Sequence, residues 1–307
     1  MRHQIILRYV LEVARTGSMR RAADRLNITA SALNRRIQDL EAELQTELFE
    51  RWARGVRLTS AGELFVRFAR DQLDHSTRIQ SRLEDLRGLK RGHVSIACSQ
   101  ALIFHYLPSQ IAKFQAINPL VNFSTKVSDH DQAVNALLAY DVDLAIAYNP
   151  SPSPMIRELA VLPQRIMVLM PHDHPLARQS EVRISDMAHY PLAMPDARYG
   201  ARRLLDDVAA RRRIKFSIAV ESDSFELLRG LVGKGDALSM QIEIGTPEPG
   251  TEGEVTTRPL AERDGTLAPL ILCQLHNRSL SVAAAKFAET IAADFEARNC
   301  LSAGAGG

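Results

Sequence analysis

The chain has 307 residues, of which 46% are hydrophobic and 24% charged, with a formal net charge of +2. This length suits a small domain plus a body of about 200 residues. No long apolar run and no apolar leader are present, which argues against a membrane span and a secretory signal. Three scattered cysteines, Cys98, Cys273 and Cys300, follow no zinc or CxxC spacing. We therefore expect a cytoplasmic location and no disulfide framework.

The second and third predicted helices form a helix-turn-helix, and one further helix precedes them. One helix covers residues 4–16 and ends at Gly17, and Ser18 can cap the short helix that follows. After a tight break, Thr29 or Ser31 can cap a third helix with apolar residues at 3-to-4 spacing. Its outer polar face suits base edges and phosphates in a major groove. An ordinary helical hairpin with a solvated polar face is the alternative.

A two-stranded wing is predicted next, with its tip at Arg54-Gly55. Residues 1–58 contain eleven arginines, no lysine and seven acidic residues, whereas residues 92–307 contain 20 basic and 24 acidic residues. A basic head on a mildly acidic body suits a protein whose head faces DNA. The candidate DNA-binding residues lie on the helix-turn-helix and the wing. They are Ser18, Thr29, Ala30, Ser31, Asn34, Arg35, Gln38, Arg51, Arg54 and Arg57.

A long helix over residues 60–88 follows, and we expect it to dimerise the chain. Ser60 to Glu63 fit a Ser-x-x-Glu capping box at its start. Residues at alternating spacings of 4 and 3 form a heptad seam. They are Phe65, Ala69, Gln72, Ser76, Ile79, Leu83 and Leu86. Packing of this helix on its own domain is the alternative.

The N-terminal part of the chain resembles the LysR-type transcriptional regulators. The residues that carry the resemblance are Ser18, Arg21-Ala22-Ala23, Leu26, Ala32-Leu33, Arg35, Ile37, Leu40-Glu41, Leu44, Leu48-Phe49, Arg51, Leu58-Thr59 and Ala61-Gly62. The rest of the chain matches more loosely, for example at His174-Pro175-Leu176-Ala177. The resemblance implies a winged helix-turn-helix, a long linker helix and a two-subdomain α/β effector domain like periplasmic binding proteins.

Three positions depart from the family pattern. Ala30 stands where the family usually has Gln, Asn34 where it has Ser, and Gln45 where it has Gly. Ala30 can touch only a thymine methyl group, while Asn34 can pair bidentately with adenine. The operator sequence therefore does not carry over from the family, and the third helix needs another way to end, such as a different turn.

Beyond a hinge at residues 89–92, strands and helices alternate, which favours parallel sheets flanked by helices. Strands are predicted at 94–98, 121–127, 144–147, 166–170, 192–194, 216–221, 237–241 and 270–274, and helices at 102–117, 132–139, 201–212, 225–232 and 281–295. The predicted organisation is a DNA-binding domain at 1–58, a linker at 59–91, an effector domain at 92–298 and a flexible tail at 299–307. The resemblance implies subdomain I at about 92–162 and 268–298, and subdomain II at 163–267.

Polar residues follow several predicted strands, where ligands of open α/β sheets bind. The candidate effector-binding residues are Ser99, Gln100, Ser128, Tyr148, Ser222 and Gln241. Ser99 and Ser222 also precede helices, whose N-termini favour an anion, although a plain N-cap is the alternative for each serine. For Tyr148, packing at the subdomain seam is the alternative.

These patterns predict a regulator that binds an inverted-repeat operator as a dimer and responds to a small anionic effector. The resemblance suggests tetramers and contact with RNA polymerase. The competing hypothesis is an enzyme, or a ligand-binding α/β protein, with an appended DNA-binding head. No reactive group with an adjacent base is recognisable, and no cofactor motif is present, so we expect neither catalysis nor a cofactor. His172-Asp173-His174 as a metal cluster and Cys98 as a redox sensor are weak signals.

Overall fold

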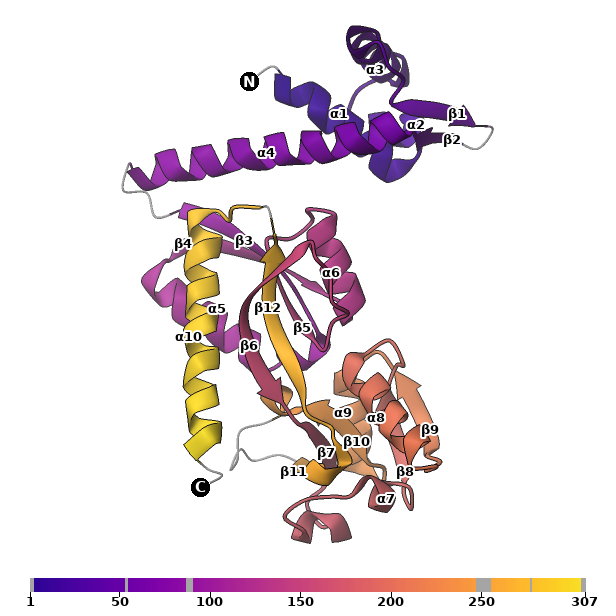
Figure 1. Cartoon of the computed structure of the whole chain (residues 1–307), viewed down its shortest axis with the longest axis vertical. Coiled ribbons are helices and arrows are strands. Elements are labelled where there is room, and N and C mark those ends of the chain that lie inside the picture. The colour runs from indigo at the N-terminus through magenta and orange to yellow at the C-terminus, as the bar shows by residue number, and fades with distance from the viewer. Residues whose placement is uncertain (1–2, 53–54, 87–90, 247–254, 277, 305–307) are drawn as a thin grey trace. The chain divides into compact units, whose positions relative to one another are not determined.

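The computed structural model describes residues 3–52, 55–86, 91–246, 255–276 and 278–304 (Figure 1). The chain divides into two compact units, residues 1–87 and residues 88–307. We call these the head and the body. Arg54, Leu89 and Lys90, which enter the predicted wing tip and hinge, lie outside the described residues.

The head is a winged helix-turn-helix. Its elements are α1 (His3–Thr16), α2 (Met19–Arg25), α3 (Ala30–Leu44), β1 (Phe49–Trp52), β2 (Gly55–Leu58) and α4 (Ser60–Leu86). The strands β1 and β2 pair antiparallel, with Phe49 opposite Leu58 and Trp52 opposite Gly55. The core joins the inner faces of the helices to the base of the wing, so α3 keeps its opposite face free.

Local signals in the sequence fix the ends of these helices. Gly17 has a φ of +61° and follows α1, and the Ser18 side chain accepts a hydrogen bond from the Arg21 amide at the start of α2. The Thr29 hydroxyl accepts from the Ala32 amide and is the cap of α3, while Ser31 lies inside the helix. Side-chain oxygens thus satisfy amides that have no partner within their helices.

Gln45 ends α3 in the left-handed conformation, with a φ of +50°. Its amide donates to the Ala42 carbonyl over 3.2 Å, and the Thr46 amide donates to the Glu41 carbonyl over 3.0 Å. This is the closing turn that glycine usually makes, so the expected change of turn is not found.

The long helix begins as predicted at Ser60, but its cap is the preceding residue. The Thr59 hydroxyl accepts from the Gly62 amide over 2.9 Å and donates to the Glu47 carbonyl over 2.7 Å. The predicted N-cap is therefore displaced by one residue, from Ser60 to Thr59. A side chain at Gly62 would lie 2.0 Å from the Leu48 carbonyl oxygen, so the wing packs here against bare backbone.

The predicted heptad seam divides into two parts. Ala69 is fully buried and Phe65 packs on the core of the head, while Gln4 of α1 donates to the Ser76 hydroxyl. This part of the seam follows the alternative interpretation, since the helix covers its own domain. Farther along, Ile79 and Leu83 are 45% and 52% exposed, and the side chain of Leu86 lies outside the described set.

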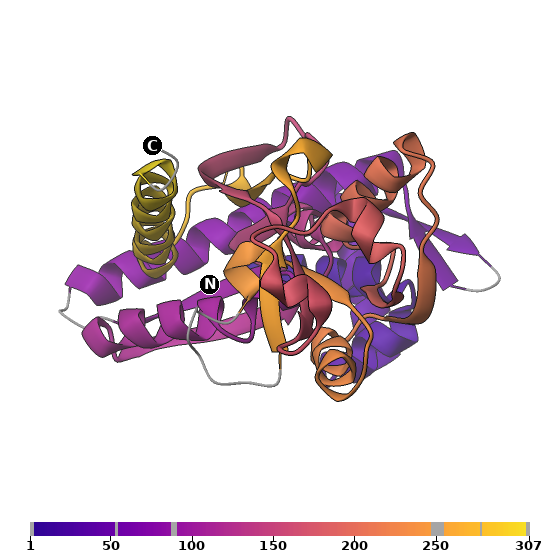
Figure 2. The ribbon, with the colours of Figure 1, turned by 90° about the horizontal axis from the view of Figure 1, so that it is seen from below.

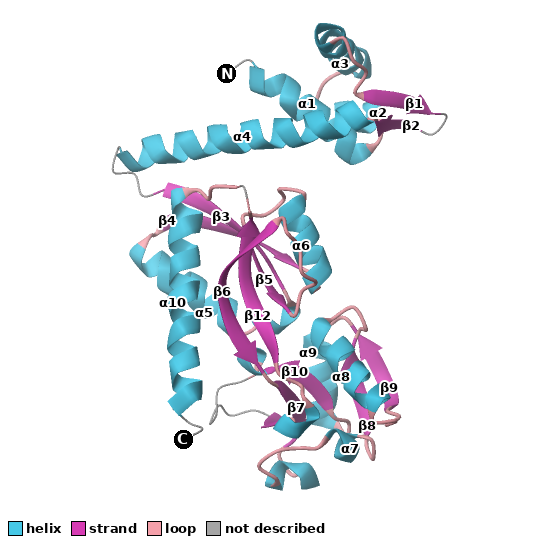
Figure 3. Ribbon diagram, viewed as in Figure 1, coloured by secondary structure: helices cyan, strands magenta, loops and turns pink. Residues whose placement is uncertain are grey.

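In the body, a five-stranded sheet has the order β4-β3-β5-β12-β6 (Figure 3). Apolar residues of α5 and α10 pack on one face of this sheet and those of α6 on the other. The helix α10 is seen nearly end-on in Figure 2. The elements are β3 (Arg91–Cys98), α5 (Tyr106–Ile117), β4 (Leu120–Val127), α6 (His130–Leu138), β5 (Leu144–Tyr148), β6 (Ile156–Gln164), β12 (Ala268–Leu275) and α10 (Val282–Gly304).

The intervening chain forms a second group of strands. A three-stranded antiparallel sheet has the order β10-β7-β11, and β8 pairs with β9 in parallel. The elements are β7 (Ile166–Pro171), α7 (Ile184–Met187), β8 (Pro191–Pro195), α8 (Gly200–Arg211), β9 (Ser217–Ser222), α9 (Phe225–Lys234), β10 (Ser239–Ile242) and β11 (Val255–Pro259). The chain passes between the two strand groups twice, from β6 to β7 and from β11 to β12.

Several predicted features of the body are corrected. The five-stranded sheet is mixed, because β12 runs antiparallel to both β5 and β6, and the three-stranded sheet is antiparallel throughout. The strands β11 and β6 were not predicted, and Pro163 of β6 fits an edge position where one amide is dispensable. The helix predicted from residue 102 is a 3₁₀ turn at Gln100–Leu102 followed by α5 from Tyr106. Gly92 lies within β3, and α10 continues through the predicted tail to Gly304.

Candidate DNA-binding surface and ligand pocket

The outer face of α3 carries most of the predicted DNA-binding side chains. Leu33 and Ile37 are buried in the head, which fixes the rotation of the helix. On the other side, Asn34 is half-buried, and the remaining candidates of this helix and its cap are exposed: Thr29, Ala30, Ser31, Arg35 and Gln38. These side chains can reach a groove together because they share one helix face.

The arginines of this surface keep their charge available for phosphate. Within the described residues, no carboxylate lies within ion-pair distance of Arg35, Arg51 or Arg57. The Arg51 Nη2 atom donates to Asn34 Oδ1 over 2.9 Å, and the Arg57 guanidinium lies 4.8 Å from the Trp52 ring centroid. Ser18 is occupied as the cap of α2, at the start of the helix-turn-helix.

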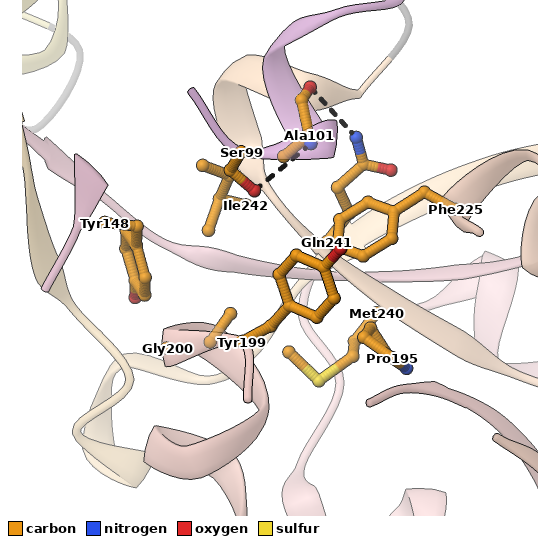
Figure 4. A pocket seen from close by; sticks show the side chains of 11 residues that line it. Ser99, Ala101, Tyr148, Pro195, Tyr199, Gly200, Phe225, Met240, Gln241 and Ile242 are labelled. Carbon is orange, nitrogen blue, oxygen red and sulfur yellow. Dashed lines mark hydrogen bonds between the residues drawn. The ribbon is translucent and has the colours of Figure 1, made fainter. Parts of the chain in front are cut away.

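A small pocket lies between the two strand groups of the body (Figure 4). Its walls come from the ends of β3 and β5, the first turns of α8 and α9, and β10. The lining residues are Ser99, Ala101, Tyr148, Pro195, Tyr199, Gly200, Ala201, Phe225, Met240, Gln241 and Ile242. Of the predicted residues, Ser99, Tyr148 and Gln241 therefore come together here.

Hydrogen bonds join the two strand groups beside this pocket. Gln241 Nε2 donates to the Gly245 carbonyl over 2.6 Å and to the Ala101 carbonyl over 3.4 Å. The Gln100 Oε1 atom accepts from the Phe225 amide over 2.8 Å, and the Ser99 hydroxyl accepts from the Ala101 amide. Gln100 thus bridges the groups and does not line the pocket.

Tyr148 brings an unpaired polar atom to the pocket wall. The residue is 4% exposed, and its hydroxyl has no hydrogen-bond partner within the described structure. Burial raises the pKa of Tyr148, so the hydroxyl stays protonated and able to donate. A buried hydroxyl without a partner is costly, which points to a group that completes it.

The start of α8 adds further donors. Tyr199 precedes this helix without a side-chain cap, and Gly200 and Ala201 of the first turn line the pocket. Amides in a first helical turn have no partner within the helix and carry partial positive charge. The neighbouring Arg202 is buried and already bonded to Asp206 and Glu221, so its charge is matched locally. The pocket therefore suits a small anion held mainly by dipoles and hydroxyls.

Like Gln100, the predicted residues Ser222 and Ser128 do not line this pocket. The Ser222 hydroxyl accepts from the Ser224 amide, and Ser224 rather than Ser222 caps α9. Ser128 is buried with no partner for its hydroxyl among the described residues, but it does not line this pocket. Tyr199 and Phe225, whose ring centroids lie 4.9 Å apart, were not predicted as pocket residues. The sequence feature that could have indicated them is the start of α8, where Tyr199 cannot cap the helix with its side chain.

The two weak signals have structural explanations. His174 is buried, its Nδ1 atom accepts from the Leu176 amide, and burial lowers its pKa. It thereby caps a turn. Burial also raises the pKa of the Cys98 thiol to about 12, so the reactive thiolate is scarce at neutral pH. In the described residues, no cluster of metal-ligating side chains is found and no helix is suited to span a membrane.

Comparison with known proteins matches both units. Residues 87–296 match the LysR substrate binding domain, and residues 6–63 match the bacterial regulatory helix-turn-helix protein, lysR family. A probable nitrogen assimilation transcriptional activator of Synechocystis sp. is 30% identical over 237 residues, covering 76% of each chain.

Two solved structures share the fold. A full-length OxyR variant from Pseudomonas aeruginosa, with aspartate in place of one cysteine, has a TM-score of 0.70 at 20% identity, covering 94% of both chains. The effector binding domain of QuiR in complex with shikimate has a TM-score of 0.57 at 21% identity, covering 67% of this chain and 98% of that domain.

Proposed function

Because the chain belongs to the LysR family of transcriptional regulators, which are DNA-binding proteins and not enzymes, we propose that it binds an inverted-repeat operator as a dimer and that a small anion in the body changes this binding. The observation that carries the proposal is the pocket, where the unpaired Tyr148 hydroxyl lies with the unprotected start of α8. The competing hypothesis of an enzyme with a DNA-binding head is set aside by the family.

The proposed division of labour follows the chain. Residues 1–58 bind DNA, residues 59–91 link and dimerise, and residues 92–298 bind the effector. Subdomain I, about 92–162 and 268–298, and subdomain II, 163–267, supply opposite walls of the pocket. A ligand that prefers one arrangement of the two subdomains shifts their equilibrium, which is how binding becomes regulation.

The dimer is proposed to form through the exposed end of α4, where Ile79 and Leu83 lie one turn apart. Two heads then present two α3 helices to one duplex, which favours a two-fold symmetric operator. Assembly of dimers into tetramers, contact with RNA polymerase and a cytoplasmic location complete the proposal, and they rest on the family.

The effector is proposed to be a small carboxylate. Ser99 and Tyr148 offer hydroxyls and the first turn of α8 offers amides, whereas no lining residue is a lysine or arginine. A site without a formal positive charge suits one negative charge and an affinity in the micromolar to millimolar range. The predicted residues Gln100, Ser128 and Ser222 are kept as surrounding residues that shape this site.

The test uses the full-length protein and DNA selected from a pool of random duplexes. A panel of small carboxylates is screened for thermal stabilisation, and operator affinity is then measured with and without each hit. Tyr148→Phe should weaken the response to the hit by about tenfold, because a hydrogen bond to a charged group is lost, and leave ligand-free DNA affinity unchanged.

Tyr106→Phe is the matched control, since Tyr106 is also buried but does not line the pocket. A response unchanged in Tyr148→Phe and Ser99→Ala would remove this pocket from the proposal.

A further inference from the structure

The body has a second hollow beside the pocket of Figure 4, which we call the Tyr148 pocket. Phe225 and Gln241 line both hollows. Ile103, Phe104 and Arg229 line only the second one, which we call the Arg229 groove. Its volume of about 390 Å³ is in the usual range of small-molecule sites. The shared wall makes the two hollows neighbours, and their other residues give them different chemistry.

Arg229 gives the groove a positive charge that no carboxylate in the described part of the chain neutralises. The residue lies on α9 and is half-buried. Its Nη1 atom lies 3.5 Å from His105 Nε2, which is a weak contact with a group that carries no negative charge. Since water screens a half-buried charge less than an exposed one, Arg229 can attract an anion into the groove.

An apolar wall lies next to this charge. Ile103 and Phe104 follow the 3₁₀ turn at Gln100–Leu102 and are 37% and 55% exposed. The Arg229 guanidinium lies 5.2 Å from the Phe104 ring centroid, so the cation and the aromatic ring are side by side. Exposed apolar side chains beside an unpaired cation suit a ligand with one apolar ring and one anionic group.

The other lining residues leave room for such a ligand. A side chain added at Gly230, the residue after Arg229, would meet nothing within 4 Å. Among the described lining residues, Glu226 is the one carboxylate, and it makes no ion pair with Arg229. Because Glu226 is exposed, water screens its repulsion of an anion more than it screens the attraction of Arg229.

We propose that the Arg229 groove binds an aromatic carboxylate, with the carboxylate on Arg229 and the ring against Phe104. This site goes beyond the proposed function, since it requires neither DNA binding nor an anion in the Tyr148 pocket. A guanidinium group can hold a carboxylate through two parallel hydrogen bonds, which fixes the orientation of the ligand. Phe104 follows β3 and Arg229 lies on α9, so the bound ligand contacts both subdomains of the body.

The test is isothermal titration calorimetry of the full-length protein with phenylacetate and two matched compounds. Phenylacetamide keeps the ring without the charge, and acetate keeps the charge without the ring. Phenylacetate should bind in the micromolar to low millimolar range. Both matched compounds should bind at least about tenfold more weakly, because each lacks one of the two contacts.

Arg229→Gln should weaken phenylacetate binding by at least about tenfold and leave the weak binding of phenylacetamide unchanged. Phe104→Ala should also weaken phenylacetate, by about tenfold, because the ring contact is lost. Arg211→Gln is the matched control, since Arg211 is an exposed arginine of α8 that lines neither hollow. Thermal unfolding followed by circular dichroism checks that each variant is folded.

Tyr148→Phe separates the two hollows, because Tyr148 lines only the Tyr148 pocket. It should leave phenylacetate affinity unchanged. Phenylacetate binding that is weakened in Tyr148→Phe and not in Arg229→Gln places the compound in the Tyr148 pocket and overturns the proposal. Equal binding of phenylacetamide, or no binding of phenylacetate up to about 10 mM, overturns it as well. A protein that binds no operator or gives no effector response contradicts the proposed function and leaves the Arg229 groove standing.

Discussion

The DNA-binding surface and the ligand pocket are built in different ways. The surface comes mostly from one helix, α3, whose buried residues Leu33 and Ile37 determine which side chains face outward. The pocket instead collects side chains from β3, β5, α8, α9 and β10, which span residues 99 to 242. A surface on one helix is encoded locally, whereas a pocket between two strand groups depends on topology.

The largest effect is expected at the C-terminal end of α4. There the spacing of apolar residues along the helix does not tell whether they pack on the head or on a second chain. The double substitution Ile79→Asp and Leu83→Asp places charges on the exposed apolar residues proposed to form the dimer. We expect a monomer at micromolar concentration and a loss of operator affinity of about 100-fold or more, because the second head no longer binds as part of the same molecule. Analytical ultracentrifugation and a DNA titration measure the two effects.

Arg67→Asp is the control for this double variant, since Arg67 is an exposed residue of the same helix that lies outside the predicted seam. It should leave the oligomer intact. If the double variant sediments like the parent and binds its operator equally well, the dimer forms elsewhere and α4 serves only its own domain.

Much of the head could be predicted from the sequence because its signals are short-range. Ser18 and Thr29 cap helices as expected, while the cap of α4 is Thr59 and not Ser60, an error of one residue. The seam was harder to assign, since spacing cannot tell whether Ala69 packs on its own domain or on a partner.

In the body, sequence patterns predicted only part of the ligand pocket. Ser99, Tyr148 and Gln241 were predicted for the site because they lie at the carboxyl ends of predicted strands, and they do line one pocket. Tyr199 and Phe225 were missed, because their convergence depends on how α8 and α9 pack against strands far away in the sequence. The strand β6 was missed as well, since its charged residues and Pro163 lack the apolar pattern of a buried strand.

The next largest effect is expected at Gly62, where the head leaves no room for a side chain. Gly62→Ala should reduce the free energy of unfolding of the head by about 2–3 kcal/mol, because the new methyl group would clash with the Leu48 carbonyl. Trp52 is the single tryptophan of the sequence and lies in the head, so its fluorescence during urea unfolding reports this transition.

Gly230→Ala is the matched substitution in the body, within α9, where an added methyl group meets nothing within 4 Å. It should stabilise the body by about 0.5–1 kcal/mol by circular dichroism and leave the Trp52 transition unchanged. A Trp52 transition that moves to higher urea concentration in Gly230→Ala would mean that the two units do not unfold separately.

A smaller effect is expected on the wing, at Arg57. Arg57→Ala removes one cation without a carboxylate partner among the described residues. Binding to all DNA sequences should weaken to a similar extent, and the slope of log affinity against log salt should fall by about one unit. Titrations at several salt concentrations measure both. A change in base preference would instead mean that Arg57 contacts bases directly. The base-reading surface would then include the wing as well as α3.

The smallest effect concerns Gln45, the residue that ends α3 in a left-handed conformation. Glutamine adopts this conformation at a cost that glycine does not have, although glycine also loses more conformational freedom on folding. The balance favours Gln45→Gly by about 0.5–1 kcal/mol. Asn27 has a φ of +53° as well, but asparagine tolerates this region better, so Asn27→Gly should gain less. If Asn27→Gly stabilises the head more than Gln45→Gly in urea unfolding followed by Trp52 fluorescence, backbone strain does not set the end of the recognition helix, and side-chain contacts of Gln45 hold it.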